Sequence, residues 1–328
     1  MERRPSRRRV LAIAAVAAGL PWSARAEVPM VAWTGQVLGT VGSIALRHPD
    51  QAAAERIVAQ AAAELRRLEG LFSLYRSDSL LVELNRRGVL VAPPPDMARL
   101  LIAALRFAEL TDGAFDPTVQ PLWELYLRHF ARPGADPEGP PAAAVAAALA
   151  RVGHRGLRVG PDAVVLARHG MAVTLNGIAQ GYITDRVVEL LRREGVAHTL
   201  VDLGEARALG RHSAARPWRA ALEDPAAPGR PWKTVDLLDR ALASSGDDGF
   251  VFDRRGRFTH LLDPASARSP RRYRAVSVLA PDATTADALS TAFALMPIEA
   301  IAAALHGLPP VEAHLLLRDG SAATLPRA

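Results

Sequence analysis

The chain has 328 residues, of which 49% are hydrophobic, 40 are basic, 34 are acidic and none is cysteine. The lack of cysteine excludes a disulfide framework, a thiolate nucleophile and a cysteine-ligated metal, and it suits an exported protein. The hydrophobic content is sufficient for a buried core, and the length allows one large domain or two modest ones.

The first 26 residues predict an export signal. Residues 6–11, Ser-Arg-Arg-Arg-Val-Leu, match the twin-arginine pattern, and a 13-residue apolar run from Val10 to Trp22 follows. That run is shorter than the roughly 20 residues that span a bilayer. Because Ala24-Arg25-Ala26 is a small-x-small cleavage motif, we expect cleavage after Ala26 and a periplasmic location without a permanent membrane anchor. An uncleaved anchor is the alternative, and residues 27–328 are predicted to form a single domain.

The basic excess lies mostly in this signal. Residues 1–26 contain six Arg and one Glu, so the remainder carries 34 basic and 33 acidic residues. The remaining arginines are scattered, and no tract combines basic with aromatic residues. A nucleic-acid partner is therefore not expected.

The first half of the mature chain alternates strands with helices. Residues 31–46 predict a strand broken at Gly39 and Gly42, because interior glycines mark bulges or close backbone approaches. Three helices are then predicted from apolar spacing and end signals: residues 51–71, a short helix capped by Ser79 that ends near Gly88, and residues 95–112. Residues 132–143 are rich in Pro and Gly and predict a surface excursion.

The middle of the chain contains a glycine-rich turn before a helix. Residues 163–175 predict a hairpin that turns at His169-Gly170. The turn 176–182 precedes a helix over 183–195 and an apolar strand over 196–204. This order places backbone N–H groups at a helix N-terminus, which is suited to binding a phosphate group.

The last third predicts mainly strands. The expected elements are strands 216–224 and 233–243, a turn 244–248, a hairpin 250–264, a strand 274–280, a helix opening near Asp287, a helix 298–307 and a hairpin 312–325. Hairpins mixed with separate helices favour an α+β fold over a doubly wound parallel sheet.

Asp287 and Thr291 form a candidate metal site. They stand four residues apart, so one helix face would present a carboxylate and a hydroxyl to a hard cation. The alternative is structural, because residues 284–287 have the form of a capping box in which Asp287 stabilises the helix N-terminus. The histidines other than His260 lack zinc-site spacing, and no G-x-S-x-G motif of a serine hydrolase occurs.

Eight motifs occur in one order between Leu38 and about Met296. They are Leu38-Gly39-Thr40, FSLYRSDS leading to Asn85, GAFDPTV, GIAQGY, VDLG with PWRAALEDP, SSGD, HLLDP and DALST. Together they resemble the ApbE family, the FAD:protein FMN transferases. The resemblance implies mixed and antiparallel sheets with flanking helices, and glycine-rich turns that line a flavin cleft.

The resemblance also implies roles for individual residues. It places the flavin near Leu38 and Tyr75, the other FAD contacts at Ala114, Phe115, Asp116, Thr174, Gln180 and Leu261, and Mg²⁺ at Gly177, Asp287, Ser290 and Thr291. His260 and Asp263 would lie beside the bond that breaks, and either could act as the base. For His260 the alternative is a strand-end histidine bonded to Asp263.

The activity implied is Mg²⁺-dependent transfer of FMN from FAD to a Thr or Ser hydroxyl, with release of AMP. The acceptor would be an exported protein, such as a flavin-carrying subunit of a redox complex. Two alternatives are an exported FAD pyrophosphatase, in which water replaces the acceptor hydroxyl, and a non-catalytic flavin-binding protein.

The chain departs from the family pattern at four places. Gln180 stands where Lys or Glu is usual, Glu205-Ala206 replaces Gly-Asp, Ala267 replaces a frequent Gly, and Leu38 replaces a frequent Met. The first departure removes one charge near the flavin or ribose. The last conserves side-chain volume.

Overall fold

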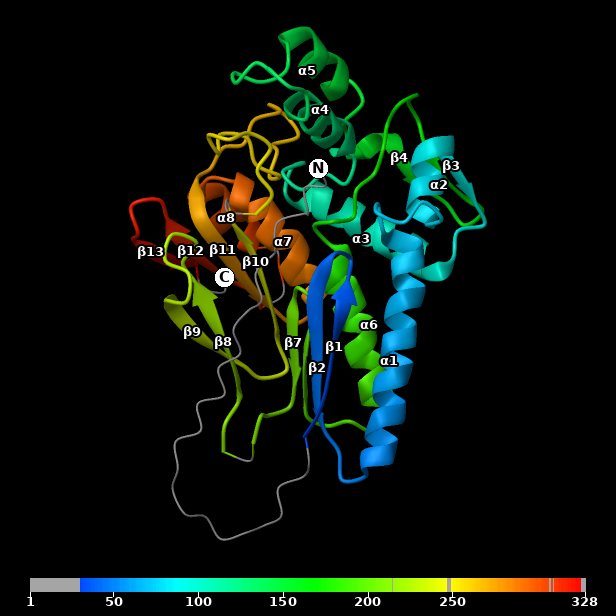
Figure 1. Ribbon diagram of the computed structural model, residues 1–328, viewed down its shortest axis with the longest axis vertical. Helices are drawn as coiled ribbons and strands as arrows, with labels where there is room; N and C mark the ends of the chain where they lie inside the picture. Colours follow the sequence, from blue (N-terminus) through cyan, green and yellow to red (C-terminus); the bar gives the residue numbers. More distant parts are fainter. Residues whose placement is uncertain (1–29, 214, 247–248, 307, 309, 326–328) are drawn as a thin grey trace.

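Eight antiparallel strands form one sheet through the middle of the computed structural model, which describes residues 30–213, 215–246, 249–306, 308 and 310–325 (Figure 1). In spatial order the strands are β1 (Met30–Val37), β2 (Thr40–Arg47), β6 (Thr199–Asp202), β7 (Ala206–Leu209), β10 (Ala241–Gly246), β11 (Tyr273–Ala280), β12 (Glu312–Leu317) and β13 (Ala322–Leu325). The predicted export signal lies outside the described residues.

Helices lie on one side of this sheet, some directly on its strands and others on neighbouring helices. Their bounds are α1 (Gln51–Phe72), α2 (Leu80–Arg87), α3 (Pro95–Leu110), α6 (Ala179–Arg193), α7 (Ala283–Leu295) and α8 (Ile298–Leu305). Ile44 of β2, Leu65 of α1 and Phe293 of α7 are all buried in the main core. Helix α7 contacts β10 and β11, α6 contacts β6 and β7, and the two helices contact each other, so they lie side by side on the sheet.

A separate hairpin covers the other face of the sheet. It consists of β8 (Trp218–Glu223) and β9 (Pro231–Leu237), at the lower left of Figure 1. Trp218 packs in a second cluster with Leu200 of β6, whereas the next residue, Val201, belongs to the main core. Because successive strand residues point to opposite faces, the sheet is buried on both sides at β6.

Two smaller units complete the fold. A three-stranded sheet contains, in spatial order, β3 (Val89–Val91), β5 (Ala163–Leu166) and β4 (Leu157–Val159). The short 3-10 helix η1 (His154–Gly156) comes directly before β4 in the chain. At the top of Figure 1, α4 (Gln120–Phe130) and α5 (Ala142–Leu149) pack against residues 250–267. This third core is aromatic: Tyr126 stacks on Phe252 and Phe258.

Most predicted elements are confirmed, but Gly42 does not break a strand. The chain turns at Leu38 and Gly39, and Gly42 continues β2 opposite Gly35. A Cβ at Gly42 would lie 2.8 Å from the Leu203 side chain. This glycine therefore serves packing and not a change of direction.

The hairpin predicted over 163–175 is wrong. Strand β5 pairs with β3 and β4, and residues 171–175 form no strand. Instead the Asn85 side chain donates to the Val173 carbonyl at 2.8 Å, and the Val173 N–H donates to Asn85 Oδ1 at 2.7 Å. The two hydrogen bonds to this amide side chain thus take the place of the backbone hydrogen bonds that a partner strand would supply.

Three predictions around residues 233–264 also need correction. The strand over 233–243 is split at Asp239, whose φ is 52°, so that β9 and β10 join different sheets. Ser244 and Ser245 extend β10 and do not form a turn. The 250–264 hairpin is irregular, with one bridge between Val251 and Thr259. Asp247 and Asp248 lie outside the described residues.

His314 of β12 is a buried titratable group beneath the β8–β9 hairpin. Its side chain is 2% exposed, and its Nδ1 lies 3.1 Å from both Lys233 Nζ and Thr324 Oγ1. Its Nε2 lies 3.8 Å from Glu312, which is paired with Arg240. Burial and the nearby Lys233 charge lower the pKa of His314 to about 4.

This pKa predicts an acid-sensitive fold. The unfolded histidine binds a proton near pH 6.5, so the stabilisation is complete above that value and is lost as the pH falls to about 4. We expect a loss of about 3 kcal/mol across this range, at 1.36 kcal/mol per pKa unit. Urea denaturation at pH 7.5 and 4.5 measures it, with His314→Gln as the non-titrating control. An equal pH dependence in both proteins would contradict the assignment.

Candidate active site

The N-termini of α6 and α7 meet at the centre of the candidate site. The Gly181 N–H in the first turn of α6 donates to Asp287 Oδ2 of α7 at 3.0 Å, and Asp287 is 3% exposed. A Cβ at Gly181 would overlap the Ala283 carbonyl and lie 2.8 Å from the Asp287 Cβ. Only glycine permits this approach of the two helices.

The alternative interpretation, in which Asp287 caps its own helix, is wrong. Helix α7 begins at Ala283, and its N-cap is Asp282, which accepts from the Thr285 N–H at 2.8 Å. Asp287 lies one turn inside α7 and instead accepts a hydrogen bond from the first turn of α6. Helix α6 also begins at Ala179, four residues before the predicted start, so the preceding glycine-rich turn is shorter than predicted.

The four predicted metal ligands lie around this junction. A Cβ at Gly177 would lie 2.9 Å from Thr291 Oγ1 and 3.3 Å from the Phe115 ring, so the turn, the Thr291 hydroxyl and Phe115 converge. The Ser290 hydroxyl donates to the Asp287 carbonyl at 3.0 Å and lies 2.9 Å from Ser245 Oγ of β10.

These residues fit a magnesium ion. They offer one buried carboxylate, one hydroxyl and backbone oxygens, and Mg²⁺ usually takes one or two carboxylates with water and phosphate completing its shell. Within the described part of the chain, no group of three or more His, Cys, Asp or Glu side chains could hold a metal ion. The donor set therefore differs from that of a structural zinc site.

Gln180 joins the start of β2, next to the predicted flavin contact Leu38, to the segment that follows β6. Its Nε2 donates to Thr40 Oγ1 at 2.9 Å and to the Leu203 carbonyl at 3.3 Å. Leu38 lies two residues before Thr40, and its N–H donates to Glu69 Oε1 of α1 at 2.6 Å. The neutral Gln180 is thus buried in the fold beside the first hairpin.

Asp116 organises a neighbouring turn. Its Oδ1 accepts from the Thr118 N–H and hydroxyl at 2.7 and 2.6 Å, and its Oδ2 accepts from the His154 N–H at 2.9 Å. The Thr174 N–H donates to the Pro117 carbonyl at 2.7 Å, so these two predicted FAD-binding segments lie side by side. Ala114 is half-buried beside them.

Tyr75 lies in the turn after α1 and is 68% exposed. Its N–H donates to Ser73 Oγ at 3.1 Å. An exposed ring at this position is available to a ligand or partner.

His260 lies on the irregular 250–264 segment. Its Nδ1 lies 3.3 Å from the Phe250 carbonyl, and a Cβ at Gly249 would lie 2.8 Å from that nitrogen. Asp263 accepts from the Ala265 N–H at 2.9 Å and the Ser266 hydroxyl at 2.8 Å. The Asp263 carboxylate thus stabilises the turn that it begins.

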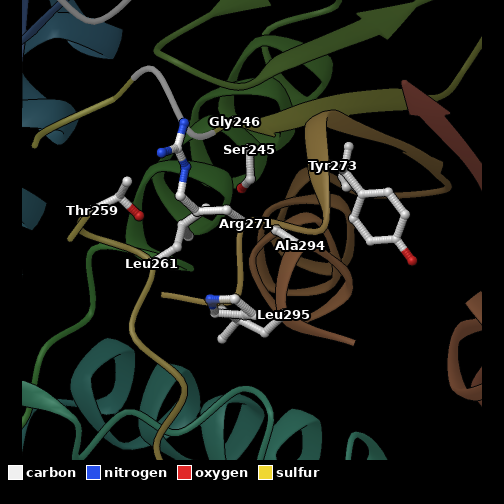
Figure 2. Close-up of a pocket in the computed structure, with 10 residues that line it drawn as sticks. Ser245, Gly246, Thr259, Leu261, Arg271, Tyr273, Ala294 and Leu295 are labelled. Carbon is white, nitrogen blue, oxygen red and sulfur yellow. The ribbon is translucent and has the colours of Figure 1, made fainter. Parts of the chain in front are cut away.

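A small cavity links this segment to α7. Figure 2 shows Ser245, Leu261 and Leu295 gathered around it. Its volume of about 10 Å³ admits at most one water molecule, so it does not hold a dinucleotide. Leu261, a predicted FAD contact, lines this cavity together with Ser245, whose hydroxyl bonds to that of Ser290.

One departure from the family pattern, Ala267 in place of Gly, has a visible structural effect. Ala267 has φ 58°, a left-handed conformation that glycine adopts most easily. Ala267 is fully buried, and its carbonyl accepts from the Tyr126 hydroxyl at 2.7 Å. The strain of a non-glycine residue here costs about 1 kcal/mol.

Sequence reasoning missed Asp185 and Arg207. Asp185 of α6 is 7% exposed and bonds to the start of α7 and to Arg207 of β7. Burial raises the pKa of the Asp185 carboxyl, and the Arg207 guanidinium opposes that rise. No feature of the sequence singles out Asp185, because the helix predicted over 183–195 places it on the same polar side as Glu189 and Arg192.

Gly181→Ala is predicted to separate the two helices. The added methyl group has no room between the Ala283 carbonyl and Asp287, so backbone must move. We expect a loss of about 3 kcal/mol in the free energy of unfolding. Chemical denaturation measures this loss. Gly195→Ala is the control for steric crowding, because a Cβ at Gly195 meets nothing within 4 Å, although its φ of 83° adds strain. Equal losses in the two variants would contradict the packing argument.

Comparisons with known proteins identify the family. The model of the ApbE family matches residues 38–315. The FAD:protein FMN transferase of Treponema pallidum is 33% identical over 279 residues, covering 78% of this chain and 75% of the relative. That of Haemophilus influenzae is 30% identical over 301 residues, covering 85% and 84%.

Solved structures show the same fold. The flavin transferase ApbE from Vibrio cholerae is 28% identical with a TM-score of 0.79, covering 92% of this chain and 97% of that one. The ApbE protein from Thermotoga maritima is 27% identical with a TM-score of 0.79, covering 90% and 96%.

Fold and comparisons together define an α+β enzyme of the transferase class. The chain belongs to the ApbE family. This membership confirms the resemblance carried by the eight sequence motifs and the α+β fold expected from it.

Proposed function

We propose that this protein transfers the FMN part of FAD to a Thr or Ser hydroxyl of a target protein, in a Mg²⁺-dependent reaction that releases AMP. Its relatives are named FAD:protein FMN transferases, which supports the substrate class. The single observation that carries the proposal is the convergence of Asp287, Thr291 and Gly177 where α6 and α7 meet.

In the proposed reaction the acceptor hydroxyl oxygen attacks the FMN-side phosphorus of FAD. A new P–O bond forms, the bond from that phosphorus to the bridging oxygen breaks, and AMP leaves with the bridging oxygen. The hydroxyl proton passes to a base of the protein. Such phosphoryl transfer depends mainly on positioning and on neutralising charge.

The residues at the helix junction would hold and orient the diphosphate. Asp287 and Thr291, with oxygens of Gly177 and Ser290, would hold Mg²⁺. When bound, that ion would neutralise negative charge on the diphosphate. The first turn of α6, which directs backbone N–H groups toward its N-terminus, adds a favourable dipole for phosphate. Leu38, Tyr75, Phe115 and Leu261 are the proposed flavin contacts.

His260 is the better supported base. If its Nδ1 donates to the Phe250 carbonyl, its Nε2 is the acceptor nitrogen and can take the hydroxyl proton. The oxygens of Asp263 accept hydrogen bonds within their own turn. Asp263 therefore supports the segment that carries His260.

One incubation separates this proposal from its rivals. The full chain is mixed with FAD, Mg²⁺ and a candidate acceptor domain containing Thr or Ser. Covalently yellow acceptor with an equal amount of AMP supports transfer. Free FMN with AMP would indicate a pyrophosphatase, and unchanged FAD would indicate a flavin-binding protein.

We also propose the setting of the reaction. The twin-arginine pattern and the Ala24-Arg25-Ala26 motif support export to the periplasm and cleavage after Ala26. No helix in the described ranges is long and apolar enough to cross a membrane. The acceptor would then be an exported flavin-carrying subunit of a redox complex. Sequencing the N-terminus of the periplasmic protein tests this, because it should begin at Glu27.

A further inference from the structure

Helices α6 and α7 cap each other. Asp287 of α7 accepts from the first-turn N–H of Gly181 in α6, at 3.0 Å. In return, Asp185 of α6 accepts from the first two N–H groups of α7, those of Ala283 and Thr284, both at 2.8 Å. Each helix thus supplies the carboxylate that satisfies the unpaired donors of the other. We call these two acids the reciprocal cap.

Asp185 is held firmly in this role. Its Oδ2 also accepts from the Thr284 hydroxyl, and its Oδ1 lies 2.5 Å from Arg207 Nη1 of β7. Oδ1 therefore has one partner on α7 and one on β7, and Oδ2 has two partners, both from Thr284 of α7. A carboxylate held by so many donors fixes the position of the groups that donate to it.

The position of α7 determines the candidate metal site. Asp287 lies only one helical turn beyond Ala283 and Thr284, and Thr291 lies one turn further. A shift of the α7 N-terminus would move the Asp287 carboxylate away from Gly181 and the Thr291 hydroxyl away from Gly177. We propose that Asp185 is a positioning residue that fixes the Asp287–Thr291 ligand pair by anchoring α7 to α6 and β7.

This inference rests on the proposed function, because it assumes that Asp287 and Thr291 hold the metal. It assigns Asp185 no contact with substrate. Partners that hold metal ligands in place typically contribute about 10- to 100-fold to metal affinity.

Asp185→Asn tests the proposal. The amide keeps one acceptor oxygen, but its NH₂ group would face either an α7 N–H or the Arg207 guanidinium. We measure Mn²⁺ binding to the full chain by electron paramagnetic resonance, with FAD present and no acceptor protein. The dissociation constant for Mn²⁺ should rise at least about tenfold. Amide hydrogen exchange at Ala283 and Thr284 should also accelerate.

Asp96→Asn is the matched control. Asp96 is another buried, ion-paired carboxylate, bonded to Arg67 at 2.6 Å and to Tyr182 of α6 at 2.7 Å. These bonds run to α1 and α6, so the loss of Asp96 should leave the Mn²⁺ constant within about twofold of wild type, whatever it does to stability.

A second variant covers the case in which Asp185→Asn does not fold. Thr284→Ala retains both backbone bonds to Asp185 and removes only the hydroxyl, so the Mn²⁺ constant should rise about fivefold. Wild-type affinity in a folded Asp185→Asn protein, or in Thr284→Ala when the first variant is unfolded, would overturn the positioning role. A wild-type chain that bound Mn²⁺ without flavinylating any acceptor would refute the proposed function alone. A wild-type chain that bound no Mn²⁺ would overturn both.

Discussion

Asp287→Asn is expected to lower the rate of flavin transfer by about a thousandfold. Asparagine keeps an oxygen that can accept from the Gly181 N–H, so the junction of α6 and α7 should survive. It removes the single carboxylate of the proposed metal site. Losing a metal's contribution costs several kcal/mol of transition-state stabilisation, and about 4 kcal/mol corresponds to three orders of magnitude.

The measurement is the initial rate of acceptor flavinylation at several Mg²⁺ concentrations. Asp282→Asn is the control, because it changes a carboxylate on the same helix to a residue that caps equally well. That variant should retain transfer to within about twofold. A near wild-type rate for Asp287→Asn at low Mg²⁺ would mean that the metal site has been assigned to the wrong residue.

His260→Ala is expected to lower kcat by about 10²- to 10⁴-fold, the range for loss of a general base. The buried core should be little affected, because His260 is only partly buried on a segment outside the regular strands. The binding of FAD should change less than kcat. Single-turnover flavinylation with saturating FAD separates the two effects.

Asp263→Asn distinguishes the two candidate bases. The amide oxygen can still accept from the Ala265 N–H, and the NH₂ group can donate to the Ser266 hydroxyl, so the turn is preserved. A decrease of less than about tenfold is expected if His260 is the base. A larger loss in Asp263→Asn than in His260→Ala would reverse the assignment.

Local signals were sufficient for the helices. The apolar spacing of α1 and the Ser79 and Gly88 caps of α2 lie within each element, and both helices form as predicted. The predicted hairpin over 163–175 failed because its partner is the Asn85 side chain, about ninety residues away. Nothing within the segment itself reports such a distant contact.

The candidate site was predicted in the same uneven way. The motifs identified Gly177, Asp287 and Thr291, and the structure brings them together. The role of Asp287 was ambiguous, because residues 284–287 match a helix-capping motif as well as the start of a metal-binding pair. The structure resolves the capping question through Gly181, whose missing side chain lets a second helix approach. Asp185 escaped notice because its partners lie on α7 and β7.

The aromatic cluster under the 250–264 segment has a consequence for how the enzyme meets its partner. Asp287 is buried on α7 between Ala286 and Ala288 of the main core. His260 lies on a segment with one strand bridge, supported by an aromatic cluster that includes Tyr126. Regions with few backbone ladder bonds open locally at lower free energy than core helices. If the proposed function holds, we expect the part that carries Asp287 to stay rigid while the His260 segment adjusts, so that one enzyme could accommodate acceptors of different shape.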